Sequence, residues 1–124
     1  IDFIGRMDIG TEFGSAKVIV LGQAKCESLD RATGGTDIAR TVAKLKRGWL
    51  GVYVTTSYFS NNVQIEILED KYPLLLINGK KLAEIVNEIV FDQGYKNVRE
   101  YLNKVDSEYD GAIKYRDPEE ILFE

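Results

Sequence analysis

The feature that constrains this chain most is an apolar strand that ends on polar residues. A run of β-branched and leucine residues, 18–21, leads through Gly22 directly into Gln23-Ala24-Lys25. Alternate side chains of a strand point to the same face, so Gln23 and Lys25 are expected to project together. A lysine at the end of a buried strand costs solvation free energy unless it meets a carboxylate, a metal-bound water or a phosphate. The pattern predicts an active site here, and the alternative is a set of solvated polar side chains.

The hydrophobic pattern predicts an α/β domain built around a mixed β-sheet, with helices on both faces of the sheet. Strands are expected at residues 1–7, 17–25, 50–57 and 74–77. Helices are expected at residues 37–47, 61–72, 80–91 and 95–105, followed by an acidic tail. Thr36 or Asp37 is expected to cap the first helix, and Ser60 or Asn61 the second. The first two strands are expected to pair as an antiparallel hairpin with a long tip.

Composition restricts the chemistry that the chain can perform. Its 124 residues include no histidine and one cysteine, Cys26. These counts exclude Ser-His-Asp and Cys-His catalysis, histidine-ligated metal sites, an internal disulfide and a thiolate zinc cluster. Any catalysis must therefore use carboxylates, amides, lysines and a hard metal ion such as Mg²⁺. Cys26 is expected to be a small core residue, and Trp49 and Tyr53 are expected in the core or in an interface.

One soluble domain is expected over residues 1–124, with no membrane-spanning stretch and no signal peptide. The net charge of −4 argues mildly against nucleic acid as a partner. The segment 31–47, however, holds one acid, Asp37, against five basic residues. Three of these recur at helical spacing and are expected either to contact phosphate or to form a solvated helix face: Arg40, Lys44 and Arg47.

The hairpin places an acid near its start beside the polar end of its second strand. The predicted constellation is Asp2, Gln23 and Lys25. The Asp2 carboxylate, the Gln23 amide oxygen and the Ala24 carbonyl can hold Mg²⁺, while Lys25 can orient the attacking water or stabilise the transition state. An exposed terminal acid is the alternative for Asp2.

Other polar residues have two open interpretations each. Asp8 is a rival carboxylate, although it is more simply the start of the hairpin turn. Glu27 continues the strand alternation and can touch the metal site or be a surface acid. The three hydroxyls that end the third strand can donate to DNA phosphate or close the strand: Thr55, Thr56 and Ser57.

These residues resemble the PD-(D/E)xK nuclease superfamily, in the Mrr-like branch where glutamine replaces the second acid to give D…Q-x-K. The matching stretches are I-D-F-I-G-R, V-L-G-Q-A-K-C, G-G-T-D-I-A-R and R-G-W-L-G-V-Y-V-T-T-S-Y-F-S. Within this branch the chain is similar to the C-terminal cleavage domain of MspJI-type modification-dependent restriction endonucleases. The resemblance covers about residues 2–77.

The resemblance implies a restriction-endonuclease-like core and Mg²⁺-dependent hydrolysis of double-stranded DNA to 5′-phosphate and 3′-hydroxyl ends. Asp2, Gln23 and Ala24 would be the metal ligands, and Lys25 would lie at the nucleophilic water. A separate domain would recognise 5-methylcytosine or 5-hydroxymethylcytosine, in the cytoplasm of a prokaryote. The family core starts with a helix that carries an accessory glutamate and that is missing here, so the chain is expected to be a C-terminal fragment of a larger protein. Since one such site cuts one strand, a homo-oligomer is expected.

Two other classes of function remain open at this point. A catalytically inactive nuclease fold can serve as a DNA-binding or oligomerisation module, which would show salt-sensitive DNA binding without metal-dependent turnover. A small-molecule-binding α/β domain is the third class, although no glycine-rich phosphate loop follows a strand. Incubation of DNA with and without Mg²⁺ separates the three.

Overall fold

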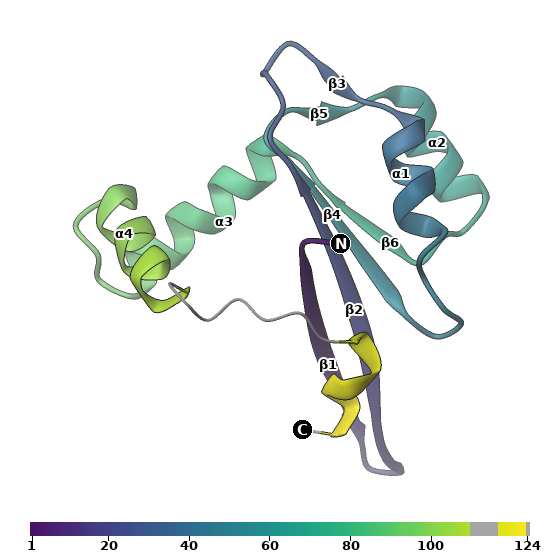
Figure 1. Ribbon diagram of the computed structural model, residues 1–124. Coiled ribbons are helices and arrows are strands. Elements are labelled where there is room, and N and C mark those ends of the chain that lie inside the picture. Colours follow the sequence, from purple (N-terminus) through teal and green to yellow (C-terminus); the bar gives the residue numbers. More distant parts are fainter. Residues whose placement is uncertain (110–116, 124) are drawn as a thin grey trace.

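The fold is a mixed β-sheet with two helices packed on one face and two further helices that extend away from it (Figure 1). A computed structural model describes residues 1–109 and 117–123. The strands are β1 (Phe3–Thr11), β2 (Gly14–Lys25), β3 (Ala32–Thr33), β4 (Leu50–Thr55), β5 (Tyr58–Phe59) and β6 (Leu74–Ile77). The helices are α1 (Gly35–Val42), α2 (Asn61–Glu69), α3 (Gly79–Asp92), α4 (Val98–Tyr109) and the 3₁₀ helix η1 (Pro118–Phe123).

The main sheet has the strand order β1-β2-β4-β6. β1 is antiparallel to β2, whereas β2, β4 and β6 run parallel to one another. The predicted mixed sheet is therefore confirmed. Lys25 at the end of β2 pairs with Thr55 at the end of β4, so the carboxyl ends of these two strands lie side by side. β3 and β5, which the sequence pattern did not predict, form a separate parallel pair beyond that edge.

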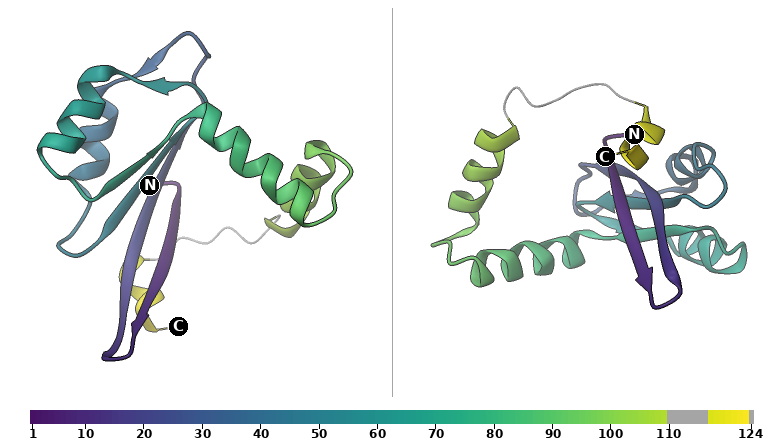
Figure 2. Two further views of the ribbon diagram at one scale, coloured as in Figure 1. Left: turned by 180° about the vertical axis from the view of Figure 1, so that it is seen from behind. Right: turned by 90° about the horizontal axis from the view of Figure 1, so that it is seen from below.

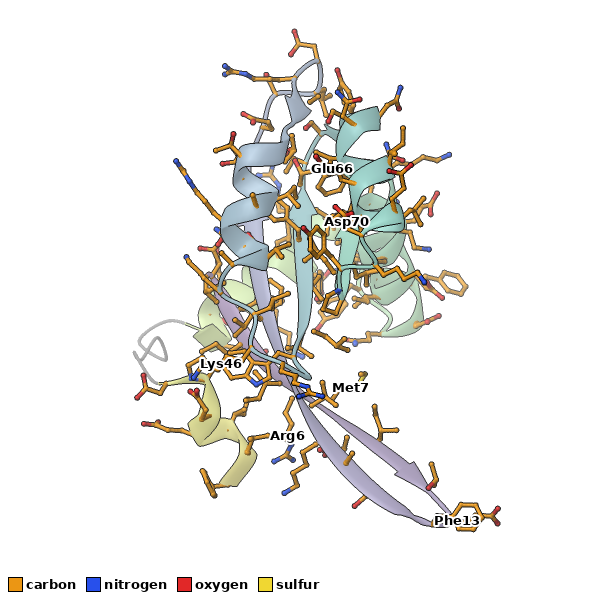
Figure 3. All side chains as sticks on the ribbon, turned by 90° about the vertical axis from the view of Figure 1, so that its right-hand side faces the viewer. Arg6, Met7, Phe13, Lys46, Glu66 and Asp70 are labelled. Atoms are coloured by element: carbon orange, nitrogen blue, oxygen red, sulfur yellow. The ribbon has the colours of Figure 1, made fainter. Side chains whose placement is uncertain are left out.

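The β1–β2 hairpin is longer than expected and forms a two-stranded ribbon that extends past the rest of the sheet (Figure 1). Pairing runs from Phe3 opposite Gly22 to Thr11 opposite Gly14. The expected long tip is thus a tight turn, because the alternation of side chains continues to its edge and Gly14 adopts a φ of 148° that closes it. Phe13 at the tip is 93% exposed, and Arg6 and Met7 point to opposite sides of the ribbon (Figure 3).

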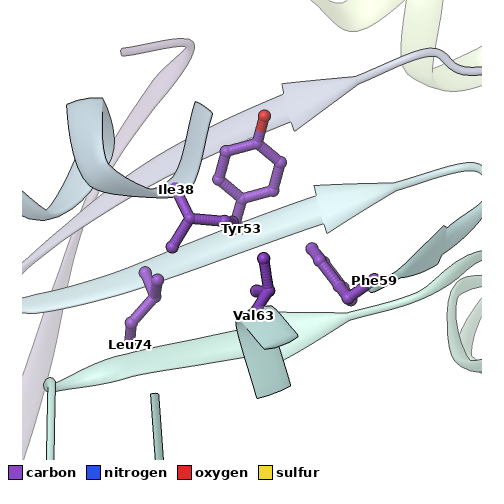
Figure 4. Packing of buried hydrophobic residues seen from close by; sticks show 5 residues of the cluster. All are labelled: Ile38, Tyr53, Phe59, Val63 and Leu74. Atoms are coloured by element: carbon purple, nitrogen blue, oxygen red, sulfur yellow. The ribbon is translucent and has the colours of Figure 1, made fainter. Parts of the chain in front are cut away.

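The core lies between the sheet and the pair α1 and α2. Its buried side chains come from both helices and from the strands, and Figure 4 shows them: Ile38, Tyr53, Phe59, Val63 and Leu74. The rings of Tyr53 and Phe59 meet edge to face with 5.9 Å between centroids. Ser60 caps α2 by accepting a hydrogen bond from the Val63 amide at 3.3 Å, as predicted. This face of the sheet is closed by side chains from two helices.

The opposite face of the sheet carries apolar side chains that no described helix covers along its length. Phe3, Met7, Ile9 and Leu75 lie on this face and are between 40% and 59% exposed. α3 begins beside it, where Leu82 lines a pocket with Val54, and then leaves the sheet (Figure 2). The prediction of helices on both faces is met only by the first turn of α3, because α3 has no buried residue that would hold it against the strands.

α1 ends earlier than the periodicity predicts, at Val42. The amides of Lys44 and Leu45 bond to carbonyls three residues back, which tightens the chain out of the helix. The tightening places Leu45 against Gly51 of β4, where a Cβ would lie 3.1 Å from the leucine. The predicted helical stripe of basic residues is therefore wrong beyond Arg40, since Lys44 and Arg47 follow the helix.

The end of the described chain folds back onto the ribbon. Arg6 donates to the carbonyl of Ile121 at 3.2 Å, and Lys17 to that of Leu122 at 3.5 Å. Lys46 pairs with Glu119 of η1. η1 thus lies on the same side of the ribbon as Arg6. Among residues 1–109 and 117–123, no helix is both long and apolar enough to cross a membrane.

Candidate active site

Asp2 lies beside the polar end of β2, as predicted. The Asp2 amide donates to the carbonyl of Gly22, the partner of Phe3 in the ladder, at 2.8 Å, which holds Asp2 against the end of β2. Its carboxylate oxygen Oδ2 accepts from Gln23 Nε2 at 2.7 Å and from the Ala24 amide at 2.8 Å. The hairpin therefore brings together three of the residues predicted for the site, across the edge where β1 begins.

The three groups that could bind a metal ion at this edge all offer an oxygen atom if the Gln23 side-chain amide is rotated. Because the N–H and C=O of a strand residue point to the same side, the Ala24 carbonyl is directed to the edge that its amide faces. The Gln23 amide presents its nitrogen to Asp2, so a 180° rotation of that amide is needed to present oxygen instead. One carboxylate, one amide oxygen and one carbonyl make a hard donor set.

This donor set fits Mg²⁺ as it binds in phosphate-processing sites, where one or two carboxylates are joined by waters and substrate phosphates. Within residues 1–109 and 117–123, no group of three or more His, Cys, Asp or Glu residues is placed to hold a metal ion. The residues at this edge whose oxygens could hold Mg²⁺ are Asp2, Gln23 and Ala24.

Lys25 is held by two carboxylates on the covered face of the sheet. Its Nζ lies 2.5 Å from Asp37 Oδ2 and 3.7 Å from Glu27 Oε2. The hydrogen bond to Asp37 is the main reason that the pKa of Lys25 is raised, and desolvation opposes it. Lys25 is consequently an ammonium at neutral pH, which suits it to stabilise negative charge rather than to accept a proton.

A cavity of about 190 Å³ opens on this face beside Gln23 and Lys25. Two of the predicted basic residues, Arg40 and Lys44, line it together with Asp37 and Thr41, and Tyr53 borders it from the core. Burial, followed by the charge of Asp37, raises the pKa of Tyr53, so its hydroxyl stays protonated. Arg47 is exposed and is not part of this lining.

A second hollow, of about 420 Å³, lies at the other face of the same strand ends. Its lining includes Asp2, Ala24, Lys25 and Cys26 from the β2 side and Leu82 from α3. Cys26 is exposed, so its predicted place in the core is wrong, because β2 has ended one residue earlier. Ala24 and Lys25 border both hollows, and Lys25 is the charged residue of the two.

The hydroxyls that end β4 tie the strand ends together. Thr55 is 0% and Ser57 7% exposed. Thr55 accepts from the Thr33 hydroxyl at 3.0 Å and lies 3.3 Å from that of Ser57. The structure thus favours the strand-closing interpretation over DNA contact for this pair, because neither hydroxyl reaches the surface.

Thr56 fastens the segment that carries the site. Its hydroxyl accepts from the Glu27 amide and donates to the Glu27 carbonyl, each at 2.7 Å, and its amide donates to the Lys25 carbonyl at 3.2 Å. These bonds fix the backbone on both sides of Cys26. Thr56 therefore also supports the strand end. Its hydroxyl hydrogen is already donated to the Glu27 carbonyl and is not available to a phosphate.

The rival carboxylate, Asp8, is away from the site. It lies on the ribbon, bound to Arg6 at 2.9 Å, and is six residue steps of extended strand from Asp2, which is roughly 20 Å. Asp37, by contrast, was expected only as a helix cap and lies at the centre of the site. Its position as the sole acid in the basic segment 31–47 is a signal that could have identified it.

No protein-family model and no curated protein matches the chain. Among solved structures, it is similar to the MspJI restriction endonuclease in complex with a 27-mer oligonucleotide, with 43% identity and a TM-score of 0.91. It is also similar to the DNA modification-dependent restriction endonuclease AspBHI, with 27% identity, a TM-score of 0.65 and 87% of this chain covered.

The first match covers 100% of this chain and 28% of MspJI, and the second covers 26% of AspBHI. The chain therefore spans about a quarter of the length of these enzymes. The predicted likeness to modification-dependent restriction endonucleases is confirmed, and the fold is that of the corresponding part of MspJI.

Proposed function

We propose that this chain is the DNA-cleaving domain of a modification-dependent restriction endonuclease, an enzyme that hydrolyses phosphodiester bonds with Mg²⁺. The observation that carries the proposal is the arrangement at the end of β2. The Asp2 carboxylate contacts both Gln23 and Ala24, and Lys25 follows on the same strand. Support also comes from the similarity to MspJI over the whole chain at 43% identity.

The site residues have distinct tasks in this reaction. Bound by Asp2, Gln23 and Ala24, Mg²⁺ would supply Lewis-acid stabilisation of the charge on the scissile phosphate. Lys25 donates hydrogen bonds from its ammonium to the attacking water or to a phosphate oxygen, and so stabilises charge as it develops. Thr56 keeps the backbone of Lys25 in place through the Lys25 carbonyl. The expected products are 5′-phosphate and 3′-hydroxyl ends.

Double-stranded DNA is the proposed substrate. Arg40 and Lys44 line the cavity beside Lys25 and can bind phosphates next to the one that is cleaved, while exposed Arg47 can contact the backbone further along. A separate domain is proposed to recognise 5-methylcytosine or 5-hydroxymethylcytosine, inside a prokaryotic cell. Since one site cuts one strand, a double-strand cut requires two copies of the chain.

Cleavage by the intact protein tests the proposal directly. Plasmid DNA and a methylated oligonucleotide are incubated with Mg²⁺ or with EDTA, using wild type, Lys25→Ala and Lys17→Ala. Lys17 lies on the same face of β2, in the ribbon and far from the site. We expect Mg²⁺-dependent cutting that Lys25→Ala lowers by at least about 10²-fold and that Lys17→Ala leaves intact. Undiminished cutting by Lys25→Ala would contradict the assignment.

One observation favours a second candidate, an inactive nuclease fold that binds DNA. The Gln23 amide donates to Asp2, and the Lys25 ammonium is paired with the Asp37 carboxylate, so these side chains are partnered with one another. This candidate predicts salt-sensitive DNA binding and no turnover in Mg²⁺. Filter binding at several salt concentrations, done beside the cleavage assay, separates it from the first.

A further inference from the structure

Asp37 occupies the first turn of α1 but does not cap that helix. The N-cap is Gly34, which offers no side-chain hydrogen bond. An acid in the first turn usually serves the exposed amides of its own helix. Here its carboxylate instead crosses to β2 and contacts the Lys25 ammonium at 2.5 Å, with 30% of the Asp37 side chain exposed. The acid of α1 is thus engaged by the neighbouring strand.

A lysine needs such a partner if its ammonium is to occupy one position. Lysine has a flexible four-carbon stem that loses considerable rotamer freedom when its ammonium is held in one place. Lys25 is 35% exposed, so packing alone does not fix its stem. Glu27 lies 3.7 Å away, beyond hydrogen-bond distance, so the short contact to Asp37 is the one that sets the place of the ammonium.

We propose that Asp37 is a positioning residue that holds the Lys25 ammonium between the two hollows at the end of β2, where it meets the scissile phosphate. The proposal rests on the proposed nuclease function. It also gives α1 a joint task, because Arg40 and Lys44, on and just after this helix, line the same cavity. Docking of one helix then places both the phosphate-binding cations and the partner of Lys25.

The test separates cleavage from binding in the intact protein. Asp37→Asn keeps the size of the side chain and removes its charge, Asp37→Ala removes the contact, and Asp37→Glu restores the charge. Asp30→Asn is the matched control, since it removes the same charge from an exposed loop residue. Single-turnover cleavage is measured at saturating Mg²⁺ and DNA, and DNA affinity is measured with Ca²⁺ in place of Mg²⁺.

We expect Asp37→Ala and Asp37→Asn to slow single-turnover cleavage by about 10- to 100-fold, as a displaced catalytic group does. Asp37→Glu should recover part of the rate. DNA affinity in Ca²⁺ should stay equal or rise, because an anion has been removed from a cavity lined by cations. The ¹⁵N resonance of the Lys25 ammonium should lose its hydrogen-bonded signature in Asp37→Ala and keep it in Asp30→Asn.

Distinct results overturn the proposal. Wild-type cleavage rates in Asp37→Ala remove the role of Asp37 and leave the nuclease function standing. Loss of DNA affinity and of thermal stability together with cleavage, in both Asp37→Asn and Asp37→Ala, shows that Asp37 only supports the fold. A wild-type protein that cuts no DNA in Mg²⁺ overturns the nuclease function, and the role of Asp37 with it.

Discussion

The two faces of the main sheet differ in what covers them and in what they carry. On the face packed by α1 and α2, the side chains of Ile19, Leu21 and Tyr53 are 2% exposed. On the other face, Met7 is 40% and Leu75 59% exposed, although both are as apolar as their counterparts. The covered face also carries the charged side chains beside the cavity. The buried core and the Lys25–Asp37 ion pair therefore lie on the same side of the sheet.

Tyr53 shows how closely the hydrophobic core and the candidate site are joined. Its ring packs against Phe59 in the core, while its hydroxyl end borders the cavity of Lys25 and Asp37. A change in the core is consequently transmitted to the site over the length of one side chain. The exposed face has no such link along most of its length, and its apolar surface is of the kind that associates with other protein surfaces.

The largest effect is expected on the covered face. Ile38 of α1 is 4% exposed within the core cluster. Ile38→Ala should lower the free energy of unfolding by about 3 kcal/mol, because it removes buried methyl groups and leaves a cavity. Urea denaturation measures this value. A loss below about 1 kcal/mol would show that the covered face is not the main source of stability.

A substitution at Gly22 tests the difference between the two faces, because Gly22 lies under Phe3 on the exposed face and Phe3 follows Asp2 of the candidate site. A Cβ on Gly22 would lie 1.8 Å from the ring of Phe3, which covers this glycine. Gly22→Ala must displace the ring, and Phe3 is the neighbour of Asp2. We expect a loss of about 1 kcal/mol in stability, typical of overpacking, and a several-fold slower cleavage. Gly10→Ala is the control, since open space surrounds its Cβ.

Leu75→Ala is the matched partner of Ile38→Ala and should sharpen the comparison. Leu75 has 59% of its surface exposed in this chain, so truncation removes little buried area. The expected loss is below about 1 kcal/mol by urea denaturation. A cost equal to that of Ile38→Ala in the intact protein would reveal that another segment or another copy packs on this face.

The smallest effect concerns the ion pair that fastens η1 near the covered face. The contact with Lys46 is the main reason that the pKa of Glu119 lies below its ordinary value of 4.5. A carboxyl group whose pKa is lowered in the folded state stabilises the protein at pH values above its unfolded-state pKa. This stabilisation is lost as the pH falls through the folded-state pKa. In thermal melts from pH 7 to pH 3, the melting temperature of Glu119→Gln should therefore fall slightly less than that of wild type. Glu12→Gln at the ribbon tip should follow wild type.

Sequence reasoning predicted the elements whose patterns are local. The alternation around residues 18–25 gave β2 and its polar end, and Ser60 gave the start of α2. It also paired Asp2 with Gln23, because a hairpin fixes which residues face each other. Features that depend on packing were missed. α1 stops at Val42 because Leu45 fits over Gly51, and no periodicity encodes that fit.

The partner of Lys25 was missed for a related reason. Asp37 precedes a helix, where capping is the local expectation, and its true contact appears only when α1 docks beside β2. The same holds for Thr55 and Ser57, because the sequence does not decide whether their hydroxyls lie at the surface or in a buried hydrogen-bond network. Local patterns thus predicted that Asp2 lies beside Gln23, whereas packing decided which side chains surround Lys25.

The hairpin that joins Asp2 to Gln23 also has a consequence for the order in which the site is built. Hairpins form within microseconds from contacts that are near in sequence, whereas docking of α1 waits for β4 and α2 to pack. We expect the three proposed metal ligands to come together first and Lys25 to be fixed last. Pulsed hydrogen exchange during refolding should then protect the Asp2 and Val20 amides before those of β4. A chain caught between these steps would have Asp2, Gln23 and Ala24 assembled while the Lys25 side chain is still without its partner.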